Sequence, residues 1–170
     1  MKFSFAVRSA QQAAILGVVT LGLFSASAIA QANPATTTFN VTATVLKDCT
    51  VSATGLSFGN YTGAALNATS AVTVTCTSGT TYTLGLNQGL TTGATVTTRQ
   101  MGITQPAGGL NYSLLSGSAT GPNWGNTSGS WVSGTGTGAG QALTVYGSIA
   151  AGQFVPPGSY TDTITATVTY

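Results

Sequence analysis

The sequence predicts an all-β fold, a single antiparallel sandwich. Three observations support this prediction. Apolar and polar residues alternate over many short segments, as they do in a strand with one buried face. No 15-residue window after residue 31 has apolar residues at helical spacing, because Gly and Thr, both poor helix formers, interrupt every candidate. Turn-forming residues separate the segments at regular intervals, which favours a Greek-key sandwich of immunoglobulin-like type.

The chain begins with the pattern of a secretory signal peptide. Lys2 and Arg8 precede an apolar stretch at residues 13–24, and Ala28-Ile29-Ala30 fits a cleavage site. A membrane anchor is the alternative, but the apolar stretch is shorter than the roughly 20 residues of a spanning helix. We therefore expect a cleaved leader at 1–30, an N-terminal extension at 31–48 and one sandwich domain at 49–170.

Alternation predicts most of the strands individually. The first alternating segment, 37–45, has Phe39, Val41, Ala43 and Val45 on one face and hydroxyl or amide residues on the other. Alternating or strand-like segments follow at 71–77, 82–86, 110–114, 143–146 and 163–170, and weaker signals lie at 50–58 and 95–103. Seven to nine short strands are expected in all.

The stretch from residue 116 to 140 is rich in Gly and Ser but contains Trp124 and Trp131. We predict a long loop with one short strand, held on the sandwich by the two indole rings. A sugar-binding platform built from the same two rings is the alternative.

Charge excludes several classes of chemistry. The 170 residues include four Lys or Arg, two Asp or Glu and no His. Without the leader, Lys47, Arg99, Asp48 and Asp162 remain, and their formal charges sum to zero. No Ser-His-Asp arrangement, His-based zinc site or acidic calcium loop can be built, and the basic residues are too few for nucleic acid. We expect no cofactor and no metal.

The two carboxylates provide the one candidate for catalysis. Asp48 and Asp162 are the only pair that a glycosidase could use. We favour the simpler interpretation, in which Asp162 bonds to nearby backbone groups and Lys47 and Asp48 are solvated. The sequence suggests no role for Arg99.

Two cysteines, Cys49 and Cys76, follow the leader. In an exported chain two cysteines most simply pair with each other, which would close a loop of 28 residues. Such a bridge contributes about 3–4 kcal/mol in the chain-entropy model. An intermolecular bridge and two free thiols stay open as alternatives.

Threonine-faced strands with few charges have a consequence for assembly. Threonine suits the pleated backbone and its hydroxyl gives solubility without charge. However, uncharged strand edges tend to pair with other chains. Either the fold covers these edges, or edge pairing is what the protein does.

An ordered set of motifs resembles the spore coat protein U domain family, which includes pilin subunits of archaic, Csu-type chaperone–usher pili. The motifs are the alternating segment 39–45, Cys49, Leu56-Ser57-Phe58-Gly59-Asn60-Tyr61, 72–77 with Cys76, 82–87, Leu110-Asn111-Tyr112, Trp124-Gly125, 145–149 and the block 158–170. The resemblance covers nearly all of residues 37–170. It departs from the family in the Trp-Gly region and in the Gly-rich stretch 133–140.

The resemblance implies a fimbrial subunit with an incomplete immunoglobulin-like fold that lacks its last strand. A periplasmic chaperone would fill the gap first, and the N-terminal extension of another copy would replace it during passage through an outer-membrane usher. In that case Phe39, Val41, Ala43 and Val45 would enter the groove of the neighbour. Ile164, Ala166, Val168 and Tyr170, in a final strand that ends the chain, would dock on the chaperone.

This interpretation predicts a non-enzymatic protein that is secreted through the periplasm to a fimbrium at the cell surface, for adhesion or biofilm formation. The segment 36–47 could instead be an ordinary first strand of a complete sandwich. A second hypothesis is a secreted, self-associating coat or matrix protein. A third is a carbohydrate-binding module that uses Trp124 and Trp131.

Overall fold

The computed structural model describes residues 33–102 and 109–170, so the predicted leader, with Ala28 and Ala30, lies outside the described residues. All regular structure in these two ranges is β, and no described helix is long and apolar enough to cross a membrane. The strands are β1 (Cys49–Ala53), β2 (Leu66–Cys76), β3 (Thr81–Leu86), β4 (Arg99–Gly102), β5 (Gly109–Leu115), β6 (Val132–Thr135), β7 (Gln141–Ile149) and β8 (Ala166–Thr169).

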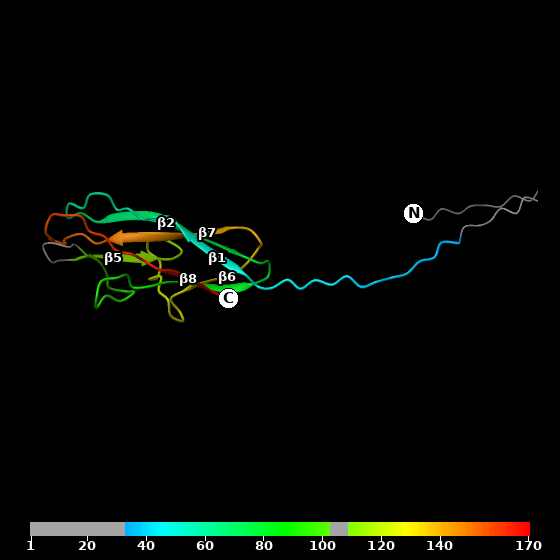
Figure 1. Cartoon of the computed structure of the whole chain (residues 1–170). Coiled ribbons are helices and arrows are strands. Elements are labelled where there is room, and N and C mark those ends of the chain that lie inside the picture. The colour runs from blue at the N-terminus through cyan, green and yellow to red at the C-terminus, as the bar shows by residue number, and fades with distance from the viewer. Residues whose placement is uncertain (1–32, 103–108) are drawn as a thin grey trace, which may run out of the picture. The chain divides into compact units, whose positions relative to one another are not determined.

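The strands form two antiparallel sheets. The larger sheet has the order β1-β2-β7-β5-β4, and the smaller one has the order β6-β3-β8. The longest strands, β2 and β7, run side by side in Figure 1 and pair from Leu66–Ile149 to Val74–Gln141. The prediction of an all-β fold with short antiparallel strands is confirmed.

Alternation decides which face of each strand is buried. In β2, Val72, Val74 and Cys76 are buried, whereas Thr73 and Thr75 between them are partly exposed. The inward side chains of the two sheets form one core, because strand side chains alternate between the two faces. The core residues are Val72, Val74, Cys76, Tyr82, Leu84, Leu86, Leu110, Tyr112, Leu114, Trp124, Val145 and Ile149.

The long loop between β5 and β7 is anchored by Trp124, one of the two rings that the sequence predicted to hold it. It contains one short strand, β6, and Trp124 is buried with its Nε1 donating to the main-chain oxygen of Leu84 at 2.9 Å. A buried ring cannot stack on a sugar, so Trp124 is an anchor. Trp131 is 37% exposed.

Some strands are shorter than their alternation suggests. The strand expected at 50–58 ends at Ala53, and Leu56 and Phe58 then pack over Gly147, where a Cβ atom would lie 2.8 Å from each of them. The strands expected at 95–103 and 163–170 are reduced to β4 and β8. Segment 37–45 belongs to no strand of the described residues.

The chain divides into two units after Thr42. Residues 33–42, the described part of the first unit, are exposed and contain no strand. The second unit, Ala43–Tyr170, contains both sheets.

Candidate functional site

Two free strand edges lie next to each other in the second unit. Among the described residues, β1 pairs only with β2, and β8 pairs only with β3. β1 and β8 approach within 8 Å between Cα atoms but share no ladder of hydrogen bonds. The backbone groups on both facing edges are therefore available to another strand.

An apolar groove continues from this gap. One wall is the chain from Ala53 to Phe58, the other runs from Tyr160 to Ala166, and the cavity between them measures about 310 Å³. The floor consists of core side chains from both sheets, namely Val72, Leu86, Tyr112, Leu114 and Val145, together with Met101. The two walls run in opposite directions, since Cys49–Ala53 lies beside β8 whereas Phe58 lies at the Tyr160 end.

Side chains along the groove are less buried than the rest of the core. Leu56, Phe58, Ile164, Ala166 and Val168 are only partly buried, although they pack against the core. Core residues of β2, β3, β5 and β7 are, by contrast, at most 7% exposed. The floor of the groove is therefore buried, whereas the side chains of its walls and of β8 beside it are partly exposed.

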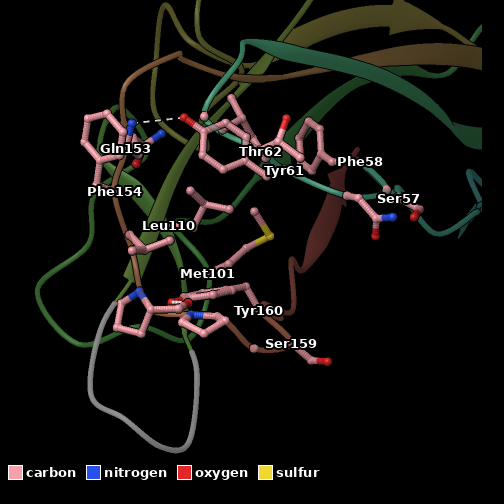
Figure 2. A pocket seen from close by; sticks show the side chains of 18 of the residues that line it. Ser57, Phe58, Tyr61, Thr62, Met101, Leu110, Gln153, Phe154, Ser159 and Tyr160 are labelled. Atoms are coloured by element: carbon pink, nitrogen blue, oxygen red, sulfur yellow. Dashed lines mark hydrogen bonds between the residues drawn. The ribbon is translucent and has the colours of Figure 1, made fainter.

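A wider pocket, here called the end pocket, lies at the Tyr160 end of the groove. Its volume is about 720 Å³, and it shares Leu56, Phe58, Met101 and Tyr160 with the groove. Figure 2 shows Met101, Leu110 and Tyr160 at its centre, with Phe154 and Gln153 on one side. The groove and the end pocket thus form one continuous site, apolar along the groove and mixed in the end pocket.

Side-chain hydrogen bonds fix the loop that borders the end pocket. Tyr61 Oη donates to the main-chain oxygen of Ala150 at 2.8 Å. It accepts from the main-chain nitrogen of Gln153 at 3.0 Å, the contact drawn in Figure 2. The Gln153 side chain also bonds both backbone groups of Asn111, accepting from N at 2.8 Å and donating to O at 2.9 Å. The pocket wall is therefore held in place by partners from three segments.

A polar cluster lies where the last segment of the chain passes between the sheets. Tyr112 Oη donates to the Asp162 carboxylate at 2.6 Å, and the same carboxylate accepts from the amides of Leu90 and Thr163. Burial, followed by the bond to Asp162, raises the pKa of Tyr112 well above its ordinary value. The predicted role of Asp162, bonding to nearby backbone, is confirmed.

Arg99 is a structural residue that the sequence did not reveal. Its side chain is fully buried, and its guanidinium donates to main-chain oxygens of four residues: Leu86, Asn87, Val96 and Trp124. Burial lowers the pKa of this guanidinium, and nearby Tyr112 and Asp162 act in the opposite direction. The one available signal was its isolation, as the only arginine after the leader.

The predicted disulfide is confirmed. Cys49 and Cys76 are bonded, they are direct partners in the β1–β2 ladder, and their Cα atoms lie 4.1 Å apart. Intermolecular pairing and free thiols are therefore excluded for these two residues. The bridge ties the start of β1 to the end of β2. The other side of β1 is one of the two free edges of the site.

The remaining predicted residues fall into two groups. Ile164 and Ala166 line the groove, Val168 packs on the core beside them, and Tyr170 is 52% exposed. The four apolar residues of the extension are all exposed: Phe39, Val41, Ala43 and Val45. Lys47 and Asp48 are exposed as expected.

The chemistry of the site suits a peptide strand. Apolar side chains predominate along the groove, and the two edges offer backbone donors and acceptors. In the described residues no three His, Cys, Asp or Glu side chains cluster as metal ligands would. An extended segment with alternate apolar side chains could fill both the edges and the groove.

Comparisons with known proteins agree on one family. The model of the Spore Coat Protein U domain matches residues 35–167. Protein U of Myxococcus xanthus is 34% identical over 174 residues, and the alignment covers 93% of this chain and 96% of Protein U.

Among solved structures, the fold is similar to that of a pilus protein. It matches a chain in the crystal structure of the CsuC–CsuE chaperone–tip adhesion subunit pre-assembly complex from archaic chaperone–usher Csu pili of Acinetobacter baumannii. The TM-score is 0.58 and the identity 24%, over 75% of this chain. The match spans 41% of the crystallised chain, so the likeness concerns the fold of one part of that protein.

Proposed function

This chain belongs to the spore coat protein U domain family, and from that premise we propose that it is a fimbrial subunit that polymerises by donor-strand exchange. The family is structural rather than catalytic. The disulfide fits an oxidising compartment outside the cytoplasm. In the proposed route the chain crosses the periplasm with a chaperone, passes an outer-membrane usher and ends in a surface fimbrium for adhesion or biofilm formation.

The groove between the free edges of β1 and β8 carries this proposal. In an immunoglobulin-type sandwich the sheets have the orders A-B-E-D and C-F-G. The order β1-β2-β7-β5 corresponds to A-B-E-D, and β3-β8 corresponds to C-F. No strand of the described residues takes the place of G, which would lie beside β8 along the groove.

The proposed occupant is the extension of a second copy. Phe39, Val41, Ala43 and Val45 recur at every second position, so a single extended strand would direct all four into the groove. The intervening residues, Thr38, Asn40, Thr42 and Thr44, would face solvent. Residues 39–45 span about 20 Å when extended, a length suited to the wall from Val168 to Asp162.

The direction of insertion follows from the connectivity of a polymer. The extension of each copy ends at Asp48, so it leaves its own domain at the Cys49 end of the groove. If the inserted strand ended at that same end of the acceptor, both neighbours would crowd one end of the domain. The strand therefore runs antiparallel to β8, with Val45 towards Tyr160, and successive domains extend head to tail.

Insertion also requires the groove to widen. Neighbouring strands lie about 4.8 Å apart, so a strand between β1 and β8 needs them about 9.6 Å apart. In the structure, Cα atoms of β1 and β8 approach within 8 Å of each other. A chaperone strand on the edge of β8, against Ile164, Ala166 and Val168 and near Tyr170, would keep the groove open until exchange.

Polymerisation of the full exported chain tests the proposal. We expect wild-type protein to form linear polymers, seen by light scattering and electron microscopy. Val41→Arg should abolish them, because the inserted face would carry a charge into an apolar groove. Thr42→Arg, on the opposite face of the same strand, is the matched control and should polymerise.

A synthetic peptide of residues 36–48 provides the second arm. Added in excess to the wild-type chain, it should cap grooves and shorten the polymers, whereas its Val41→Arg version should not. Equal polymerisation of the two chain variants, or equal capping by the two peptides, would contradict donor-strand exchange.

A coat protein is the second candidate. The observation in its favour is the full-length similarity to Protein U, against a partial match to the pilus structure. A self-associating coat would assemble from purified chain into irregular sheets or aggregates. A pilin should give unbranched fibres and need a chaperone for high yield in the periplasm.

A further inference from the structure

Leu46 interrupts the polar face of the extension. The outward positions of the alternating segment are hydroxyl or amide residues up to Thr44, and Leu46 is the next in that series. Its side chain is 76% exposed. Its main-chain oxygen accepts a bond from Thr77 Oγ1 at 3.3 Å, which holds Leu46 beside the end of β2 in its own domain.

Phe154 is a second apolar side chain without cover. It borders the end pocket and is 95% exposed, the highest exposure among the large apolar residues of the described chain. Its neighbour Gln153 is fixed through Tyr61 and Asn111. The loop is therefore pinned directly beside Phe154, so the exposure of this ring follows from a fixed backbone.

Strand insertion would bring these two residues together across copies. With Val45 of the inserted strand towards Tyr160, the next residue of that strand reaches the end pocket. Side chains alternate along a strand, so Leu46 points out of the groove where Val45 points in. The border of the end pocket is where Phe154 stands exposed.

We propose that Phe154 of each acceptor packs against Leu46 of the copy that fills its groove, forming a second contact surface between successive subunits. This contact rests on the strand exchange proposed above. It covers two exposed apolar side chains at once and places the tethered end of the donor strand against the acceptor. The junction between subunits is thereby held at a point outside the groove.

Photocrosslinking in the assembled polymer tests the contact. Phe154 is replaced by p-benzoylphenylalanine, and the variant is polymerised as a mixture of ¹⁵N-labelled and unlabelled full chains. After irradiation, mass spectrometry should find crosslinks between chains that map to residues 45–48. Crosslinks that map elsewhere, or only within one chain, in polymers that form normally would overturn the contact and leave strand exchange intact.

Polymer lifetime provides an independent readout. Leu46→Ser and Phe154→Ser should each still polymerise, but the polymers should dissociate about tenfold faster in urea, because each variant loses the burial of a large apolar side chain. Polymers of the double variant should dissociate no faster than those of the faster-dissociating single variant, because both substitutions remove the same contact. Thr44→Ser is the matched control on the same face. Unchanged dissociation in both variants would contradict the contact, whereas failure of the wild-type chain to polymerise would contradict strand exchange itself.

Discussion

The guanidinium of Arg99 donates a hydrogen bond of 2.7 Å to the main-chain oxygen of Trp124, 25 residues further along the chain. The same side chain bonds to Leu86, Asn87 and Val96. One buried cation thus joins the end of β3, the start of β4 and the loop that carries Trp124. Arg99 therefore holds three segments of the fold together through hydrogen bonds to their main-chain oxygens.

Arg99→Met should therefore destabilise the domain strongly. It leaves main-chain oxygens without a donor, and each such buried group costs about 1–3 kcal/mol. We expect the free energy of unfolding to fall by about 3 kcal/mol or more, measured by urea denaturation. Lys47→Met removes an exposed cation and should change it by less than about 0.5 kcal/mol. A comparable effect of the two substitutions would contradict the role of Arg99.

Alternation was the part of the sequence that predicted structure well. β2, β3, β5 and β7 each have one buried face, so a period of two marks them directly. The prediction of a strand at 50–58 was wrong beyond Ala53. Leu56 and Phe58 pack over Gly147, which has no side chain, and this contact with a distant strand cannot be read from the local pattern.

The site was predictable only in part. Ile164 and Ala166 could be proposed from the alternation of the last segment. Arg99 could not, because its partners are main-chain oxygens, which leave no mark in the sequence. The end pocket also escaped prediction, since its wall depends on Gln153 meeting the backbone of Asn111, 42 residues away.

The burial of Tyr112, together with its bond to Asp162, predicts a pH dependence. The pKa of Tyr112 is raised in the folded chain above its ordinary value of 10.0, so the folded state holds this proton more tightly than the unfolded state. The stabilisation is complete below pH 10 and is lost as pH rises towards the folded pKa, by up to about 1.4 kcal/mol per pH unit.

Tyr112→Phe should remove this slope. Urea denaturation between pH 8 and pH 11 should show the wild-type chain losing stability above pH 10 more steeply than the variant. Tyr170→Phe, at an exposed position, is the control and should follow the wild-type curve. Parallel curves for wild type and Tyr112→Phe would show that another group governs the alkaline transition.

Gly147→Val should impair the uptake of a donor strand as well as the stability of the domain. A Cβ atom at Gly147 would lie 2.8 Å from both Leu56 Cδ1 and Phe58 Cζ, which are the far ends of movable side chains. They can shift, but both line the groove, so we expect it to narrow. Binding of the 36–48 peptide should weaken at least tenfold, which is about 1.4 kcal/mol or more, and the free energy of unfolding should fall by about 1–3 kcal/mol.

Gly55→Val is the matched control for that substitution. Gly55 belongs to the same wall, but it is exposed, does not line the cavity, and a Cβ atom there meets nothing within 4 Å. The control should bind the peptide like wild type. Normal peptide binding by Gly147→Val would mean that the groove is not the peptide site.

Two inactive variants should complement each other if each copy has one donor strand and one groove. Val41→Arg spoils the donor strand and leaves the groove intact, whereas Ile164→Arg blocks the groove and leaves the strand intact. Neither should polymerise alone, because each lacks one half of every junction. An equimolar mixture should give heterodimers and nothing longer, since one functional strand meets one functional groove.

Light scattering after size-exclusion chromatography measures the size of these assemblies directly. Thr42→Arg and Thr163→Arg, at exposed neighbouring positions, are the controls and should polymerise. A mixture that remains monomeric, or one that forms long polymers, would contradict the assignment of the two halves.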